Sequence, residues 1–199
     1  MSDISPRHNA DCGARYGYGY ATAWLSECGQ YRWSLDRTWG SGPIAWWVML
    51  NPSTADAEVD DPTIRRCVAF SKREGCGSLH VTNLYSLRAT DPAELALHKD
   101  PKGEQTTDLL VEASYHARAG GLVIVAWGAH PMAVKGAGSV ERMFQAAGAK
   151  CLGTTKQGQP KHPLYVRSDQ PLAPWRWRYG PALIDGCSTP NNTGSCDDQ

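Results

Sequence analysis

The stretch at residues 46–54 constrains the fold of this chain more than any other. A run of large apolar side chains, which begins with two adjacent tryptophans, stops at the polar turn Asn51-Pro52-Ser53. Near-continuous apolar runs are typical of strands that are buried on both faces of a sheet. In α/β proteins, ligands bind beyond the carboxyl ends of such strands. We therefore expect a buried central strand over residues 44–50 and a ligand site directly after it.

The rest of the chain repeats this layout, with apolar runs separated by segments of helical periodicity. The expected strands cover residues 31–39, 44–50, 78–84 and 122–127, and a further short strand begins at residue 151. The expected helices cover residues 61–74, 106–119 and 139–147. Strands that alternate with helices predict a three-layer α/β/α fold with a central, mostly parallel sheet.

A chain of 199 residues can form a single domain with a buried core. We expect a mobile or loosely packed N-terminal arm over residues 1–20, because this segment is rich in Gly and Tyr and has no periodicity. The domain itself is expected over residues 21–186. Residues 187–199 are rich in Ser, Asn, Gly and Asp, which predicts a disordered tail.

The formal net charge is zero, so no overall field attracts nucleic acids or membranes, although a local basic face is compatible with this balance. The seven cysteines form no Cys-x-x-Cys pair and no spacing typical of metal ligands. The sequence also shows no signal peptide or long apolar span. We expect a cytoplasmic protein with reduced thiols, without a cofactor, a bound metal or a membrane partner.

Polar groups stand at the ends of the apolar segments. In chain order they are Asn51-Pro52-Ser53, Thr82-Asn83, Trp127-Gly128 and His162-Pro163. Parallel strands place their carboxyl ends on one side of a sheet, so we expect these groups to converge on one cleft.

The chemistry of these groups suits a nucleobase. Cleavage of an N-glycosidic bond needs a positioned water, tolerance of positive charge on the sugar, and hydrogen bonds to the leaving base. The amide of Asn83 carries a donor and an acceptor in one plane, which matches the edge of a pyrimidine. A neutral His162 can donate one N–H to a departing base.

Several motifs resemble known families. The segments at residues 50–56, 60–63 and 82–88 are similar to the domain of unknown function 1643 family, and this resemblance extends over roughly residues 28–170. More distantly, the order of the four strand ends resembles that of the uracil-DNA glycosylase superfamily.

The distant resemblance implies a uracil-DNA-glycosylase-like fold, DNA as the partner, and roles for particular residues. Asn51 would position the water, Asn83 would read the base, and His162 would stabilise the leaving group. Leu164 or Tyr165 would enter the duplex in place of a flipped base. The other residues implied to contact the substrate are Pro52, Ser53, Trp127 and Gly128.

The loops around these motifs supply further candidates. Asp61 follows the first motif closely and is expected to contact the site. Tyr85 and Arg88 follow Asn83, and Arg88 is expected either to clamp a phosphate or carboxylate or to pair with Asp91.

The acidic run Asp56, Glu58, Asp60 and Asp61 has two interpretations. It could bind Mg²⁺, which needs only one or two carboxylates. The commoner interpretation, which we favour, is a solvated loop in which Asp61 caps the following helix.

Basic residues late in the chain predict contacts with a nucleic-acid backbone. Lys156, Lys161 and Arg167 lie near Trp175 and Trp177, and basic residues beside aromatic ones suit phosphate contacts and base stacking. A solvated face is the alternative.

Two departures from the glycosylase pattern keep other functions open. His162-Pro163 is followed by Leu164 rather than by Ser-Pro, and no Asp stands directly before Pro52. We expect hydrolysis of the N-glycosidic bond of a pyrimidine, modified or unmodified, in DNA. The alternatives are a non-catalytic binder of a modified base or nucleotide, and a metal-dependent enzyme that acts on free nucleotides.

Overall fold

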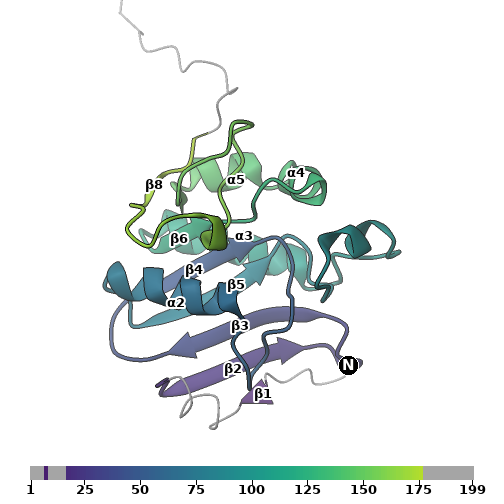
Figure 1. Cartoon of the computed structure of the whole chain (residues 1–199), viewed down its shortest axis with the longest axis horizontal. Coiled ribbons are helices and arrows are strands. Elements are labelled where there is room, and N and C mark those ends of the chain that lie inside the picture. The colour runs from purple at the N-terminus through teal and green to yellow at the C-terminus, as the bar shows by residue number, and fades with distance from the viewer. Residues whose placement is uncertain (1–6, 9–16, 177–199) are drawn as a thin grey trace, which may run out of the picture.

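The structure, a computed structural model, describes residues 7–8 and 17–176, so the tail expected over residues 187–199 lies outside the described residues. Within the described part, eight strands form one sheet in the order β1-β2-β3-β5-β4-β6-β7-β8 (Figure 1). The strands are β1 (Arg7–His8), β2 (Tyr20–Leu25), β3 (Arg32–Thr38), β4 (Ile44–Met49), β5 (Ser78–Asn83), β6 (Leu122–Val125), β7 (Lys150–Cys151) and β8 (Ala173–Pro174). The α-helices are α2 (Pro62–Arg73), α3 (Thr106–Arg118), α4 (Pro131–Ala137) and α5 (Glu141–Ala146), and the short 3-10 helices are η1 (Pro92–Ala96) and η2 (Pro163–Tyr165).

The sheet is mixed rather than mostly parallel. Strand β4 runs parallel to β5 and β6, and β6 runs parallel to β7. The margins are antiparallel, because β1, β2, β3 and β5 alternate in direction and β8 reverses against β7. The short connection at residues 26–31 explains one of these margins, since strands joined by a tight hairpin must be antiparallel.

Helices cover both faces of the central strands. On one face Trp47 packs in a core with Ile64 of α2, and on the other Trp46 packs in a core with Leu110 of α3. Successive side chains of β4 therefore point to opposite layers. Both of these indole N–H groups have a partner: Trp46 donates to Thr82 Oγ1 at 3.1 Å and Trp47 to the Ser71 hydroxyl at 2.9 Å.

The order of the parallel strands reverses at β4. Helix α2 leads from β4 to β5 on one side, and α3 then returns the chain across β4 to β6 on the other side. The helices that follow β4 and β6 lie on opposite faces, because α2 contributes to one core and α4 to the other. Such a reversal opens a crevice at the carboxyl ends of the strands, where α/β proteins bind ligands.

The structure differs from the expected elements at several positions. Arg7–His8 pairs with β2, and the buried Tyr18 donates to Asp60 Oδ2 at 2.6 Å, so parts of the expected N-terminal arm belong to the fold. Strand β6 ends before Trp127. Helix α4 was not expected; it begins with His130 as its cap and Pro131 in its first turn.

Among the described residues, the free thiols are Cys28, Cys67, Cys76 and Cys151. None of the helices within the described ranges has the length and apolar character needed to span a membrane.

Candidate functional site

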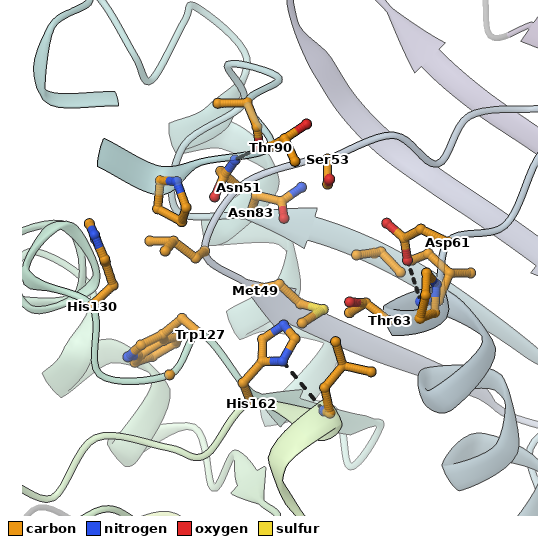
Figure 2. A pocket seen from close by; sticks show the side chains of 18 of the residues that line it. Met49, Asn51, Ser53, Asp61, Thr63, Asn83, Thr90, Trp127, His130 and His162 are labelled. Atoms are coloured by element: carbon orange, nitrogen blue, oxygen red, sulfur yellow. Dashed lines mark hydrogen bonds between the residues drawn. The ribbon is translucent and has the colours of Figure 1, made fainter. Parts of the chain in front are cut away.

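A cavity of about 580 Å³ lies at the carboxyl ends of β4, β5 and β6 (Figure 2). The structure thus brings residues from all four predicted strand ends to one place. The predicted site residues that line it are Asn51, Ser53, Asp61, Asn83, Trp127, Gly128, His162, Leu164 and Tyr165.

The side chain of Asn51 is held in one orientation. Its Nδ2 group donates to the carbonyl oxygens of Pro52 at 3.0 Å and Ala89 at 2.8 Å. Two carbonyl acceptors require the amide nitrogen, so they also fix where Oδ1 lies. Among the described residues nothing donates to this Oδ1, which leaves a preoriented acceptor for a water or a ligand N–H.

Asn83, the last residue of β5, has an unpaired amide. Only 2% of the residue is exposed, and its buried Nδ2 finds no hydrogen-bond partner within the described part of the chain. A buried donor without a partner is costly, and such groups in native proteins are commonly satisfied by a ligand or an ordered water. Figure 2 shows the Asn83 amide beside that of Asn51 at the same wall of the cavity.

His162 points its ring into the cavity from the opposite side (Figure 2). Its Nδ1 accepts a hydrogen bond from the backbone N–H of Leu164 at 3.4 Å, which assigns the proton of the neutral ring to Nε2. Burial lowers the pKa of His162, and the nearby Asp61 carboxylate opposes this shift. The neutral ring therefore offers an N–H donor to the cavity.

Asp61 reaches the cavity because it caps α2. Its Oδ1 accepts from the backbone N–H of Ile64 at 2.8 Å, and Pro62 occupies the first turn of the helix. The predicted helix cap is therefore confirmed. The cap places the carboxylate at the cavity wall that faces His162 (Figure 2).

Two other members of the acidic run, Asp56 and Asp60, serve the fold. Asp60 is buried, not solvated as expected, and forms an ion pair with the buried Arg37 at 2.8 Å. Asp56 closes a turn by accepting from the N–H groups of Glu58 and Val59. No group of three or more His, Cys, Asp or Glu side chains in the described ranges could hold a metal ion.

Arg32 is a residue of the site that the sequence did not reveal. It opens β3, which runs antiparallel to β5, so its side chain reaches the edge where β5 ends. Arg32 is buried and lines the cavity, and its guanidinium donates to the carbonyl of Ala55. The signal available in the sequence was an arginine between two aromatic residues, Tyr31 and Trp33, at the start of an expected strand.

Three of the predicted substrate-contacting residues lie outside the cavity lining. Pro52 is buried, and its carbonyl accepts from Asn51 and Ala89. Tyr85 is buried, and its hydroxyl donates to the Met132 carbonyl at 3.1 Å. Arg88 donates to the Gly29 carbonyl at 3.4 Å and lines neighbouring surface hollows; the structure gives it no ion pair to Asp91 within the described residues.

The rim of the cavity is partly apolar. Leu164 and Tyr165 are 41% and 83% exposed. Gly128 lies in the left-handed region with φ 78°, and its N–H donates to the Pro160 carbonyl, which holds the loop of Trp127 next to that of His162.

The predicted basic face is only partly formed by free side chains. Lys156 is exposed, Lys161 is half-buried, and Arg167 pairs with Asp169 at 2.9 Å on the surface. Trp175 is a core residue that packs edge-on against Trp127, so it cannot stack on bases. Trp177 lies outside the described residues.

Comparison with known proteins identifies a family. No curated protein and no solved structure matches the chain. One family profile matches residues 32–164, a segment that contains every residue of the cavity lining except Tyr165. The match covers more than half of the chain, which therefore belongs to the family described as "Protein of unknown function (DUF1643)".

Proposed function

We propose that the protein is a DNA glycosylase with a uracil-DNA-glycosylase-like fold that acts in the cytoplasm. It would bind a pyrimidine base of DNA, modified or unmodified, in the cavity and hydrolyse the N-glycosidic bond of that base. The observation that carries this proposal is the convergence of an oriented acceptor on Asn51, an unpaired amide on Asn83 and an N–H donor on His162 around one cavity. The volume of about 580 Å³ accommodates a base and part of its sugar.

The amide of Asn83 recognises the base in this proposal. A pyrimidine such as uracil presents a ring N–H next to a carbonyl oxygen, and a planar amide pairs with both at once. Because the Nδ2 of Asn83 is unpaired among the described residues, the bound base would supply the partner that the protein lacks. Bases without this donor and acceptor pair would leave the amide unsatisfied and bind more weakly.

The remaining polar groups serve the hydrolysis. A water held by Oδ1 of Asn51 attacks the anomeric carbon as the bond to the base breaks. The electron pair of that bond leaves with the base, which accepts a hydrogen bond from Nε2–H of His162. The Asp61 carboxylate stabilises the positive charge on the sugar and takes the proton of the water.

The rim suits a duplex from which a base has been extruded. Leu164 and Tyr165 are exposed next to His162, where an apolar side chain can fill the gap left in the stack. Lys156 and Lys161, which precede this loop, would contact phosphates.

Oligonucleotides that carry uracil or a modified pyrimidine test the proposal, with alkali used to cleave any abasic site. We expect strand breaks with the native protein and a loss of about a hundredfold or more in Asn51→Ala and His162→Gln. Glu112→Gln, an exposed change on α3, is the matched control and keeps full activity. Native cleavage rates in folded Asn51→Ala and His162→Gln would overturn the assignment.

One observation favours a second function, the binding of a base without cleavage. Asp61 uses one carboxylate oxygen to cap α2. This hydrogen bond makes the carboxylate a weaker base for the proton of the attacking water. A shift of the same oligonucleotides in a binding assay, with no abasic product under any condition, would establish this alternative.

A further inference from the structure

Arg32 carries a buried charge without a counter-ion. The residue is 2% exposed, yet no carboxylate of the described residues lies within ion-pair distance of its guanidinium. One terminal nitrogen donates to the Ala55 carbonyl, whereas the buried Nε has no partner in the described part of the chain. A buried cation in this state is unfavourable unless something else compensates it.

Arg37 on the same strand shows how the chain compensates a buried guanidinium elsewhere. Its Nε donates to Asp60 at 2.9 Å, and further hydrogen bonds go to the carbonyls of Thr22 and Asp36. Arg32 lacks such a partner and, unlike Arg37, lines the cavity. The cavity is therefore the place from which a ligand could reach Arg32.

The charge of Arg32 persists at neutral pH. Burial lowers its pKa to about 10, and the more distant carboxylates of Asp61 and Asp56 oppose that shift. The cavity therefore holds a positive charge on its β3 side, and the Asp61 carboxylate lines the cavity near the N-terminus of α2.

A second group in the same lining also lacks an acceptor. The Nδ2 of Asn83 is buried and unpaired among the described residues, like the Nε of Arg32. Both groups are donors, so the ligand that satisfies them must present acceptors. An anionic oxygen group makes the strongest hydrogen bonds to a guanidinium.

We propose that the ligand of this cavity is an acidic pyrimidine, in which an anionic oxygen group is bound by Arg32 while the ring edge is bound by Asn83. The inference rests on the proposed binding of a base. The oxyanion has two sources, a carboxylate on the ring or the phosphate of a nucleotide, and the two share the same chemistry at Arg32.

Titration calorimetry on the full chain separates these sources. The probes are uracil, 5-carboxyuracil, orotate, dUMP and inorganic phosphate. We expect at least one carboxylated pyrimidine, or dUMP, to bind about tenfold to a hundredfold more tightly than uracil, as charge-assisted hydrogen bonds in a buried site imply. Preference for the carboxylated bases assigns the oxyanion to the ring, and preference for dUMP assigns it to the nucleotide.

Variants then locate the preference. Arg32→Gln is expected to bind the charged probe no better than uracil. Arg32→Lys is expected to keep part of the preference, because lysine retains the positive charge but lacks the two parallel N–H donors of a guanidinium. Arg118→Gln, which makes the same change on the exposed end of α3, keeps the native preference. Circular dichroism checks that each variant is folded. If Arg32→Gln does not fold, the affinity ratio of charged probe to uracil in Arg32→Lys and in the native protein still tests the inference.

Three results have distinct meanings. Equal affinity of the native protein for uracil and for all charged probes overturns the inference and leaves the base-binding function standing. An unchanged preference in folded Arg32→Gln also overturns it. Binding of phosphate that depends on Arg32, with no pyrimidine bound, overturns the proposed function and the acidic pyrimidine with it, and leaves Arg32 as a site for phosphate alone.

Discussion

At the scale of single residues, His162 links pH to stability. Burial lowers its pKa in the folded protein, whereas a histidine in the unfolded chain has a pKa of about 6.5. As the pH falls through that value, the unfolded chain binds the proton first, so the free energy of unfolding decreases. We expect His162→Gln to lose less stability than the native protein between roughly pH 7.5 and pH 5. Urea denaturation at each pH measures this, and equal losses in both proteins would contradict it.

The buried pair of Arg37 and Asp60 makes a second prediction at this scale. Both side chains are fully buried and lie 2.8 Å apart. Arg37→Met leaves the Asp60 carboxylate buried without its partner, which typically costs about 3–5 kcal/mol. Chemical denaturation measures the free energy of unfolding of each variant. The double variant Arg37→Met/Asp60→Asn should lose less of it than the sum of the losses in the two single variants. Strict additivity would mean that the two side chains do not stabilise each other.

At the scale of elements, the sequence predicted the centre of the fold better than its margins. The bounds of β4, α2, β5 and α3 agree with expectation within a residue or two, because long apolar periods and the Asp61-Pro62 cap mark them strongly. The antiparallel pairing of β3 with β5 was missed because β4 and α2 separate these strands in the sequence, and no local pattern encodes such a pairing. For the same reason Arg32 could not be assigned to the site, since it reaches the cavity only through the antiparallel register of β3.

The cap of α2 allows the structural and the chemical roles of Asp61 to be separated. Asp61→Ala removes the hydrogen bond to the Ile64 N–H and should cost about 1 kcal/mol of stability. Asp61→Asn keeps an oxygen that can cap the helix but removes the charge from the cavity. We therefore expect near-native stability and a large loss of strand cleavage in Asp61→Asn, measured by thermal denaturation and by the alkali assay. Native cleavage in Asp61→Asn would limit Asp61 to its structural role.

At the scale of the whole molecule, strand order explains why the predicted strand ends met. Asn51 follows β4, Asn83 ends the neighbouring parallel strand β5, and Trp127 follows β6 on the other side of β4. The expected parallel direction of these strands was therefore sufficient to predict that their ends meet at one edge of the sheet. His162 caps η2, and strand order does not account for its position. Tyr85 and Pro52 lie in the same loops and are buried outside the cavity lining. An irregular loop has no fixed period, so the sequence does not show which of its side chains face the cavity.

A cavity built from distant segments should respond to a ligand as one unit. A ligand at about a hundred times its dissociation constant adds about 2.7 kcal/mol to the free energy of any opening that destroys the site. With the tightest-binding pyrimidine, we expect slower amide hydrogen exchange in the segments at residues 49–54, 61–64, 83–90, 127–130 and 162–165. Strand β2 contributes no residue to the lining. Its amides that exchange through local opening should therefore exchange at the same rate with and without ligand. Slowing confined to residues 83–90, with none at 127–130 or 162–165, would mean that the ligand does not bridge the two sides of β4.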